Sequence, residues 1–185
     1  MRRRFVLLDR DGTINEEIGY VLRPEELRLI PGALEALCEL CDLGLGLVVV
    51  TNQSPIARGT LSPEGLEAIH ERLRELLAEG GVRLDGIEHC PHLPDDGCAC
   101  RKPGTAMVER AARAHGFVPS ETWVVGDHAG DMQLGRAVGA RTILVLSGHG
   151  EEQRQSAWPF ADHVVADLQE AAAVIRDEVL AGAQP

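Results

Sequence analysis

Short apolar runs alternate with longer helical patterns along almost the whole chain, and this alternation limits the possible folds more than any other feature of the sequence. Strands that alternate with helices are typical of βαβ units and a parallel sheet. The runs LVVV and ILVL are continuously apolar, which indicates strands that helices cover on both faces. The sequence therefore predicts an α/β fold with one doubly wound parallel sheet.

We expect six strands and five helices. The strands are predicted at residues 5–9, 45–52, 86–90, 122–127, 142–146 and 163–166. The helices are predicted at residues 31–44, 62–81, 105–115, 130–138 and 168–181. In the first helix, Leu34, Leu37, Cys38 and Cys41 recur on one face, which assigns both cysteines to the core. The tail at 178–185 loses helical signals, so we expect it to fray.

Composition narrows the class of protein. A chain of 185 residues suits a single domain, here residues 1–185, and 44% hydrophobic with only 3% aromatic residues predicts an aliphatic core. The 29 acidic and 18 basic residues give a net charge of −11, which argues against nucleic acid or an anionic membrane as a partner. Apolar runs are too short for a membrane span or a signal peptide. We therefore expect a cytoplasmic protein, and we predict a monomer.

Polar side chains follow three of the predicted strands. They are Asp9 and Asp11 after the first strand, Thr51 and Asn52 at the end of the second, and Asp127, with Asp131 nearby, after the fourth. In doubly wound sheets, ligands bind beyond the carboxyl ends of the strands. We therefore expect one crevice that is lined from three separate parts of the chain.

The charge pattern of this crevice indicates a metal. The carboxylates of Asp9 and Asp11 would repel each other unless a cation lay between them, and Mg²⁺ is the default hard cation. Asp127 would supply a third acid, and Lys102 and Thr51 could bind an anion. The pattern predicts a site that handles the phosphoryl group of a small phosphorylated molecule. The alternative is a simple turn after the first strand and a helix cap at Asp127.

The same residues resemble the four motifs of the haloacid dehalogenase-like (HAD) phosphatases. DRDGT resembles the first motif, VVVTN the second, the lysine of RKPG the third and GDHAGD the fourth. The resemblance spans nearly the whole chain. It implies a phosphoric monoester hydrolase that works through an aspartyl-phosphate and lacks a large cap domain.

The resemblance also implies a role for each motif residue. Asp9 would be the nucleophile, and Asp11 would protonate the leaving alcohol and then deprotonate water. The substrate would be held by Thr51, Asn52, Arg101 and Lys102. Magnesium would be bound by Asp9, the main-chain carbonyl of Asp11 and Asp127, with Asp131 in support.

The acid role of Asp11 leads to two expectations about its surroundings. The neighbouring carboxylate, and burial when substrate closes the site, should raise the pKa of Asp11, because an acid must carry a proton before it can donate one. The side chain of Arg10 should point elsewhere.

A loop rich in cysteine offers a second metal site. CPHLPDDGCAC, residues 90–100, contains Cys90, His92, Cys98 and Cys100. Three thiolates and one imidazole can surround structural Zn²⁺ and leave no position open for water. We expect the zinc to stiffen the loop that carries Arg101 and Lys102. The alternative is a pair of buried thiols beside a surface histidine.

Several stretches narrow the resemblance to one group within the family. DRDGTIN, GYVLRPEE, TNQSPIARG and the cysteine loop resemble members that remove the C7 phosphate of a heptose bisphosphate. Members that act on histidinol phosphate share the cysteine loop and remain the alternative. Arg101 is expected to bind the second phosphate with two hydrogen bonds. The alternative is that its side chain only packs on the zinc loop. Pro55 and His128 depart from the group pattern, which puts the substrate in question.

Overall fold

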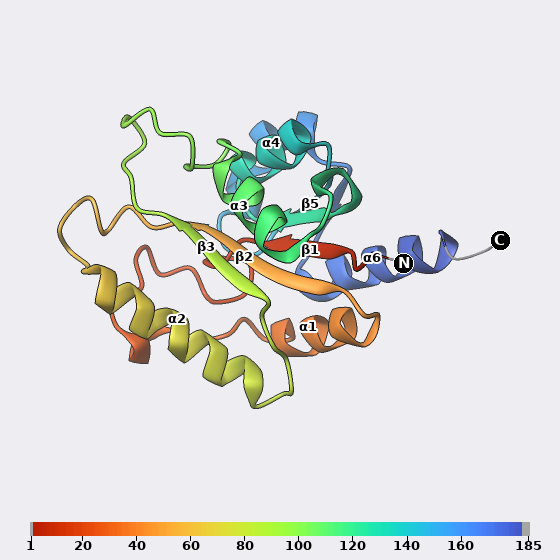
Figure 1. The fold of residues 1–185 in the computed structure, drawn as a ribbon, viewed down its shortest axis with the longest axis horizontal. Helices are drawn as coiled ribbons and strands as arrows, with labels where there is room; N and C mark the ends of the chain where they lie inside the picture. The colour runs from red at the N-terminus through yellow and green to blue at the C-terminus, as the bar shows by residue number, and fades with distance from the viewer. Residues whose placement is uncertain (1, 183–185) are drawn as a thin grey trace.

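The computed structural model describes residues 2–182, with one six-stranded sheet at its centre (Figure 1). The strands are β1 (Phe5–Leu8), β2 (Gly46–Asn52), β3 (Gly86–Cys90), β4 (Trp123–Gly126), β5 (Arg141–Val145) and β6 (His163–Val165). They lie in the order β3-β2-β1-β4-β5-β6, and every neighbouring pair is parallel. The six predicted strands are confirmed, each within a residue or so at its ends.

In the described part of the chain, six α-helices surround this sheet. They are α1 (Ala33–Asp42), α2 (Pro63–Ala78), α3 (Ala106–His115), α4 (Ala129–Val138), α5 (Gly150–Ala157) and α6 (Leu168–Ala181). Three short 3-10 helices lie at Pro24–Glu26, Pro119–Glu121 and Trp158–Phe160. Among residues 2–182, no helix is both long and apolar enough to cross a membrane.

Helices cover both faces of the sheet. Apolar side chains of α1, α2 and α6 share one buried cluster with strand residues such as Leu8 and Val49. Side chains of α3 and α4 share another cluster with Leu7 and Val48, the alternate residues of the same strands. Figure 1 shows α1 and α2 on one side of β2 and α3 and α4 on the other. The predicted doubly wound sheet is therefore confirmed.

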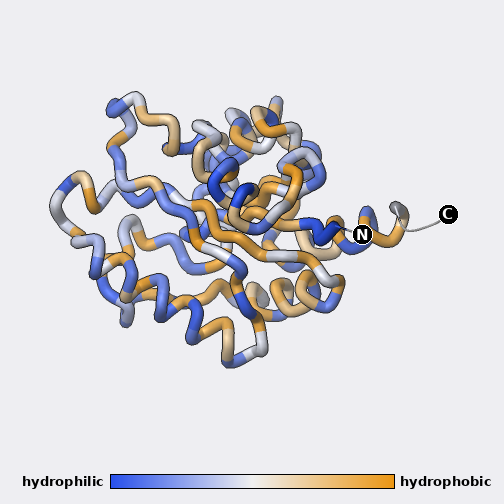
Figure 2. The backbone as a smooth tube through the Cα atoms, in the orientation of Figure 1, coloured by the Kyte–Doolittle hydropathy of each residue, from blue (hydrophilic) through white to orange (hydrophobic). Residues whose placement is uncertain are grey.

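Strand β1 and the first five residues of β2 are apolar because neither face of them meets water. All four residues of β1 are buried, as are the first six residues of β2. Figure 2 shows this central band in the hydrophobic colour, while blue segments gather at the periphery. Removal of these aliphatic side chains from water is the main favourable contribution to the free energy of folding.

Helix α5 is absent from the sequence prediction. Its sequence, GEEQRQSA, has no apolar stripe, and only Gly150 and Ala157 are buried. Sequence periodicity reveals a helix through the apolar residues of its buried face. Helix α5 buries only two small residues, so its sequence shows no such periodicity.

The buried face of α1 also differs from the prediction. Ala33, Ala36, Leu37 and Leu40 are buried, whereas Cys38 and Cys41 are half-buried at the margin of the core. Helix α1 packs against α6 as well as β2, so its buried stripe turns towards the space between them.

Helix α6 has the predicted bounds and continues through Ala181, so residues 178–181 are helical. Residues 183–185, the rest of the tail expected to fray, lie outside the described residues, as does residue 1.

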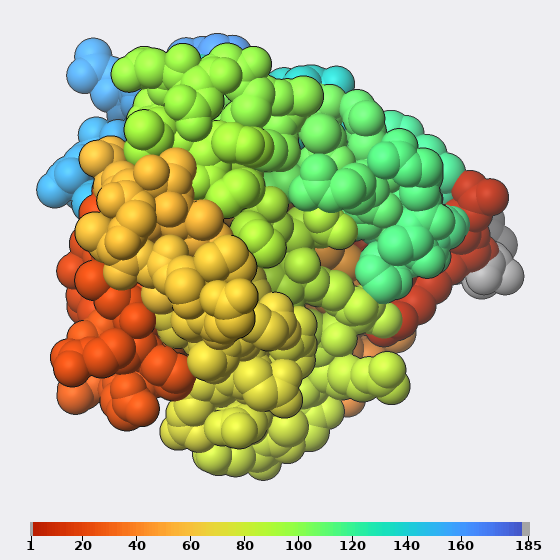
Figure 3. Space-filling model, turned by 60° about the vertical axis from the view of Figure 1, so that its left-hand side comes forward, coloured from red at the N-terminus to blue at the C-terminus, as the bar shows by residue number. Residues whose placement is uncertain are grey.

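Three loops crowd the carboxyl ends of the strands. In Figure 3 the red-orange segment after β1, the orange-yellow segment between β2 and α2, and the green segment after β3 lie next to one another on this face. Among residues 2–182, no further domain or layer covers them. The walls of any site at this edge must therefore come from these loops.

Candidate active site

A cavity of about 260 Å³ lies at the edge where the strand order reverses. Strand β1 has β2 on one side and β4 on the other, and the chain continues outward from each. Such a reversal leaves a crevice at the carboxyl ends of the strands. The side chains that line the cavity include Asp9, Asp11, Glu17, Thr51, Asn52, Gln53, Arg101, Lys102, Asp127, His128, Asp131 and His149. All eight residues predicted to serve catalysis, substrate or magnesium are among them.

Three carboxylates meet in this cavity. One oxygen each of Asp9, Asp127 and Asp131 lies within 4.8 Å of the others. The Lys102 ammonium lies beside them, with Nζ 2.8 Å from Asp9 Oδ1 and 2.6 Å from Asp131 Oδ1. It also donates to the main-chain carbonyl of Val50, at 2.9 Å. One fixed cation thus faces three acids, which leaves the cluster with an excess of negative charge.

That excess is visible in the pKa values. Burial raises the pKa of Asp9 to about 6, with Lys102 opposing the rise and Asp131 adding to it. Burial and the charges of Asp9 and Asp131 raise the pKa of Asp127 to about 8. Burial alone would lower the pKa of Lys102, but Asp131 and Asp9 raise it well above its usual value. A further cation would relieve the repulsion and restore the charged form of the acids.

Asp127 does not cap helix α4, so the cap alternative is wrong. The N-cap is His128, whose Nδ1 accepts from the main-chain N–H of Gly130 at 3.1 Å. Asp131 completes the capping box by accepting the N–H of His128. Asp127 Oδ2 instead accepts the main-chain N–H of His149, from the loop before α5. Its carboxylate is thereby directed into the cavity.

A glycine lets Asp127 approach the end of β1. Gly12 has φ +79°, a left-handed conformation that favours glycine, and a Cβ there would overlap the Asp127 carboxylate. The glycine after the two acids is therefore required both for the turn and for the close approach of two strand ends.

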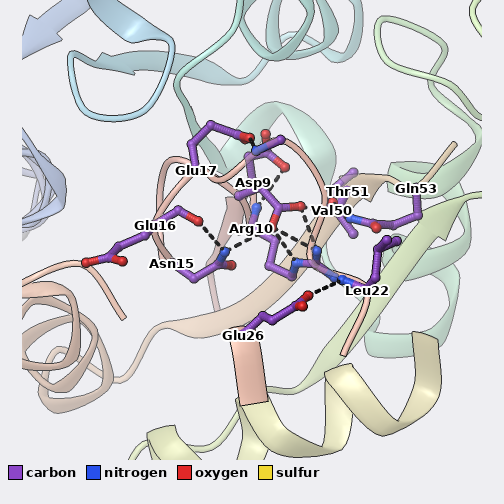
Figure 4. Close-up of polar contacts among 12 residues, drawn as sticks. Asp9, Arg10, Asn15, Glu16, Glu17, Leu22, Glu26, Val50, Thr51 and Gln53 are labelled. Atoms are coloured by element: carbon purple, nitrogen blue, oxygen red, sulfur yellow. Dashed lines mark hydrogen bonds and ion pairs between the residues drawn. The ribbon is translucent and has the colours of Figure 1, made fainter. Parts of the chain in front are cut away.

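Arg10 holds Asp11, contrary to the expectation that it points elsewhere. Its guanidinium donates to Oδ1 of Asp11 at 2.8 and 3.1 Å and to Oδ2 at 2.7 Å (Figure 4). Asn15 and Gln53 each add a hydrogen bond at 2.9 Å. Burial raises the pKa of Asp11, but Arg10, Asn15 and Gln53 outweigh it and lower the net pKa. In this conformation the pKa of Asp11 is therefore lowered, and its expected rise on closure of the site around substrate stays a prediction.

The end of β2 supplies an ordered polar row. Thr51 is buried, and its Oγ1 accepts from Gln53 Nε2 at 2.9 Å. The Oδ1 atom of Asn52 accepts the main-chain N–H of Lys102 at 3.1 Å. Asn52 thereby ties the strand end to the loop that carries the lysine.

The cysteine loop brings its four predicted ligands together. Sγ of Cys98 lies 3.6 Å from Sγ of both Cys90 and Cys100, and the Nδ1 atom of His92 lies 3.2 Å from Cys100 and 3.5 Å from Cys90. Tetrahedral zinc with Zn–S bonds near 2.3 Å would place sulfurs about 3.8 Å apart. Sγ of Cys90 and Sγ of Cys100 lie closer, at 2.8 Å, so the four donor atoms converge as a metal site requires, with one sulfur pair tighter than in tetrahedral zinc. His92 is half-buried against the thiols, so the alternative of a surface histidine is wrong.

Comparisons with known proteins agree with this geometry. Residues 99–171 match the family described as HAD-hydrolase-like. A curated relative from Pseudomonas putida, named D-glycero-beta-D-manno-heptose-1,7-bisphosphate 7-phosphatase, is 41% identical over 94% of this chain and 98% of its own. The chain belongs to the haloacid dehalogenase-like phosphatase family.

Two further similar proteins also match this HAD phosphatase over nearly its whole length. A D-glycero-D-manno-heptose-1,7-bisphosphate 7-phosphatase from Thermosynechococcus vestitus is 40% identical over 91% of this chain and 93% of its own. The crystal structure of D,D-heptose 1.7-bisphosphate phosphatase from B. bronchiseptica, complexed with magnesium and phosphate, has a TM-score of 0.88 and 35% identity. It covers 95% of this chain and 99% of that one.

Several residues that the sequence did not single out individually also line the cavity of this HAD phosphatase, although the absence of a large cap led us to expect residues 12–20 and 53–60 in its walls. Gln53 bridges Thr51 and Asp11, and its place directly after Asn52 could have marked it. Glu17 and Tyr20 lie in the loop after β1, and His149 precedes a helix that gave no signal. Their positions depend on how loops fold back over the sheet.

The two departures from the group pattern have different places in the HAD fold. His128 lines the cavity beside Asp127, whereas Pro55 is buried outside it and accepts main-chain hydrogen bonds from Thr60 and Leu61. Only His128 can therefore meet a ligand in the cavity.

Proposed function

We propose that the chain is a magnesium-dependent phosphatase that removes the C7 phosphate of D-glycero-D-manno-heptose 1,7-bisphosphate through an aspartyl-phosphate intermediate. The supporting observation is the acid cluster of Asp9, Asp127 and Asp131 around buried Lys102. It occurs in a chain that is 41% identical to a relative of that name. A cytoplasmic location and a monomeric state remain predictions from the sequence.

Asp9 is the proposed nucleophile. Its Oδ1 is engaged by Lys102 and by the main-chain N–H of Arg10, at 2.8 and 2.7 Å, and both contacts favour the anion that attack on phosphorus requires. Its Oδ2, which has no hydrogen-bond partner among residues 2–182, would form the bond to phosphorus as the bond to the leaving oxygen breaks. Lys102 and Thr51, which line the same cavity, would hold the phosphoryl oxygens.

The acid cluster fits magnesium. The cluster offers carboxylate oxygens, which are the donors that Mg²⁺ prefers. A divalent cation bound there would also lower the raised pKa values of Asp9 and Asp127. Asp9, the main-chain carbonyl of Asp11 and Asp127 are the proposed ligands, with Asp131 in support. When bound, magnesium would neutralise negative charge on the nucleophile and the phosphate.

Asp11 is the proposed acid and base. The hydrogen bonds from Arg10, Asn15 and Gln53 favour its anion, which is the form that remains after it has protonated the leaving alcohol. In the second half of the reaction this anion accepts a proton from the attacking water, which regenerates the acid.

The four residues Cys90, His92, Cys98 and Cys100 are the proposed ligands of a structural zinc ion. The loop that they close carries Arg101, whose Nη1 donates to the His92 carbonyl at 3.1 Å. It also carries Lys102 into the acid cluster. Zinc would thereby fix two cations that face the substrate.

The proposal is tested with a substrate panel and one variant. Purified protein in Mg²⁺ is given the heptose bisphosphate, histidinol phosphate and p-nitrophenyl phosphate, and released phosphate is measured with and without EDTA. We expect the highest kcat/KM on the heptose bisphosphate and no turnover in EDTA. Asp9→Asn should lower kcat by at least about a thousandfold, because the amide cannot form the acyl phosphate.

Each result against the proposal has a separate meaning. A higher kcat/KM on histidinol phosphate would reject the substrate and favour the alternative enzyme. Undiminished hydrolysis by Asp9→Asn would reject the covalent mechanism. Asp85→Asn is the matched control, because Asp85 bonds to Arg3 and Leu47 far from the cavity.

A further inference from the structure

Ser147 joins the loop after β5 to the turn after β1. Its hydroxyl donates to the main-chain carbonyl of Gly12 at 2.7 Å, across 135 positions of the sequence. Within residues 2–182, Ser147 is not among the side chains that line the active-site cavity. The proposed reaction does not use it, so this long-range contact has no role yet.

The turn that Ser147 holds carries a proposed magnesium ligand, the main-chain carbonyl of Asp11. That carbonyl and the N–H of Gly12 belong to one planar peptide unit, so they turn together. The N–H of Gly12 donates to the carbonyl of Asn15 at 2.7 Å, and the carbonyl of Gly12 accepts the Ser147 hydroxyl. Glycine has no side chain to restrict its backbone, so these two hydrogen bonds hold the Asp11 carbonyl in direction.

The same loop holds a second proposed ligand, the carboxylate of Asp127. The main-chain N–H of His149 donates to its Oδ2 at 2.8 Å. Gly148, between the two donors, has φ +55°, and a Cβ there would overlap both the Asp127 carboxylate and the backbone of Gly12. Residues 147–149 therefore pack directly against two of the proposed ligands.

One support shared by two ligands sets the distance between them. A cation binds more tightly when its ligands are already in place, because less of the binding free energy is spent on ordering them. We propose that Ser147 is a positioning residue of the magnesium site, which holds the Asp11 carbonyl in place relative to the Asp127 carboxylate. This inference rests on the proposed function, since it concerns the same metal ligands.

The test measures metal binding directly, with Mn²⁺ as the probe. Like Mg²⁺, Mn²⁺ prefers carboxylate and carbonyl oxygens, and the EPR signal of the free ion disappears when it binds. Dissociation constants are measured without substrate for wild type, Ser147→Ala, Ser147→Thr and Ser156→Ala. Ser156 is the matched control, because its hydroxyl also donates to a main-chain carbonyl, that of Gln153 at 2.8 Å, and it is exposed on α5.

We expect Ser147→Ala to raise the Mn²⁺ dissociation constant about tenfold, because residues that orient metal ligands typically have effects of this size. The Mg²⁺ concentration for half-maximal hydrolysis should rise in parallel, whereas kcat at saturating Mg²⁺ should stay close to the wild-type value. Ser147→Thr keeps the hydroxyl and should bind Mn²⁺ nearly as tightly as wild type. Ser156→Ala should match wild type in every measurement.

Three outcomes would overturn the inference. They are an unchanged Mn²⁺ affinity in Ser147→Ala, an equal loss of affinity in Ser147→Thr, and a lower melting temperature of Ser147→Ala without any change in Mn²⁺ affinity. Failure of the proposed function looks different. Wild type and Asp127→Asn would then bind Mn²⁺ equally, or wild type would hydrolyse no phosphate ester in Mg²⁺, whichever residue stands at position 147.

Discussion

The guanidinium of Arg10 is fully buried and decides the state of its neighbour Asp11. It makes three hydrogen bonds to that carboxylate, while its Nη1 has no partner among the described residues. When one partner of a buried ion pair is removed, the other charge is left unpaired in the interior. The free energy that this costs is larger than the net stability that the intact pair provides. Arg10 is therefore part of the same unit as Asp11.

Arg101 offers a residue-scale prediction about the second phosphate. Its Nη1 bonds the His92 carbonyl, and the side chain lines the cavity. A guanidinium can bind a phosphate with two hydrogen bonds, so Arg101→Ala should raise KM for the heptose bisphosphate about tenfold or more. KM for p-nitrophenyl phosphate should change little.

Arg110→Ala is the control for this change, since Arg110 pairs with Glu88 outside the cavity. An equal loss on both substrates would show that Arg101 acts only by packing on the cysteine loop.

Gly12 offers a second residue-scale prediction. Gly12→Ala should lower kcat/KM about tenfold or more and raise the Mg²⁺ concentration needed for half-maximal activity, because the added Cβ would displace Asp127. Gly59→Ala carries similar backbone strain, at φ +71° against +79°, but its Cβ would meet nothing. Equal activity in the two variants would mean that the approach of Asp127 is not needed.

At the scale of elements, the cysteine loop links strand β3 to the substrate end of the site. Cys90 is the last residue of β3, and Asn52 at the end of β2 fixes the far end of the loop through Lys102. The loop has no regular structure between residues 91 and 104. Its order therefore comes from hydrogen bonds such as those of Asn52 and Arg101, and from the four donor atoms with whatever they bind.

We predict that Cys98→Ser abolishes stoichiometric zinc binding, measured by metal analysis. It should lower kcat/KM about tenfold or more, because Lys102 and Arg101 lose their support. The melting temperature should fall as well, since bound metal stabilises the folded state. Cys38→Ser is the control, because Cys38 lies in α1 away from the cluster. Wild-type protein that carries no zinc, or full activity in Cys98→Ser, would contradict the prediction.

At the scale of the whole molecule, the acid cluster couples stability to pH, and we expect magnesium to change this coupling. The pKa values of Asp9 and Asp127 rise to about 6 and about 8 in the fold, against 3.8 for the ordinary side chain. Between these values the folded state binds more protons than the unfolded state. Stability is therefore greatest at low pH within this range and is lost as pH rises through about 6 and then about 8.

In EDTA, we expect the melting temperature to fall from about pH 5 to about pH 8, as followed by circular dichroism. Mg²⁺ should flatten this fall, because it favours the ionised acids of the folded state. Asp127→Asn should weaken both effects. A melting temperature that rises with pH in EDTA would contradict the charge balance of the cluster.

Much of the architecture could be predicted because it is encoded locally. Strands β1 and β2 are continuous apolar runs, and their polar ends are visible in the chain as DRD and TN. The parallel order then brings Asp9, Thr51 and Asp127 to one edge, since all strands point the same way. The spacing of the cysteines likewise indicated their convergence.

Only the tertiary structure decided how side chains face at that edge. Arg10 turns back to Asp11, which Gln53 from the loop after β2 also contacts, and no local sequence pattern predicts this arrangement. The same holds for Glu17, for the surface helix α5 and for the stripe of α1 that meets α6. The sequence determines periodicity and strand polarity, which are properties of neighbouring residues. Rotamers, ion pairs and loop positions depend on residues far apart in the chain, so they were settled only when the sheet and its loops came together.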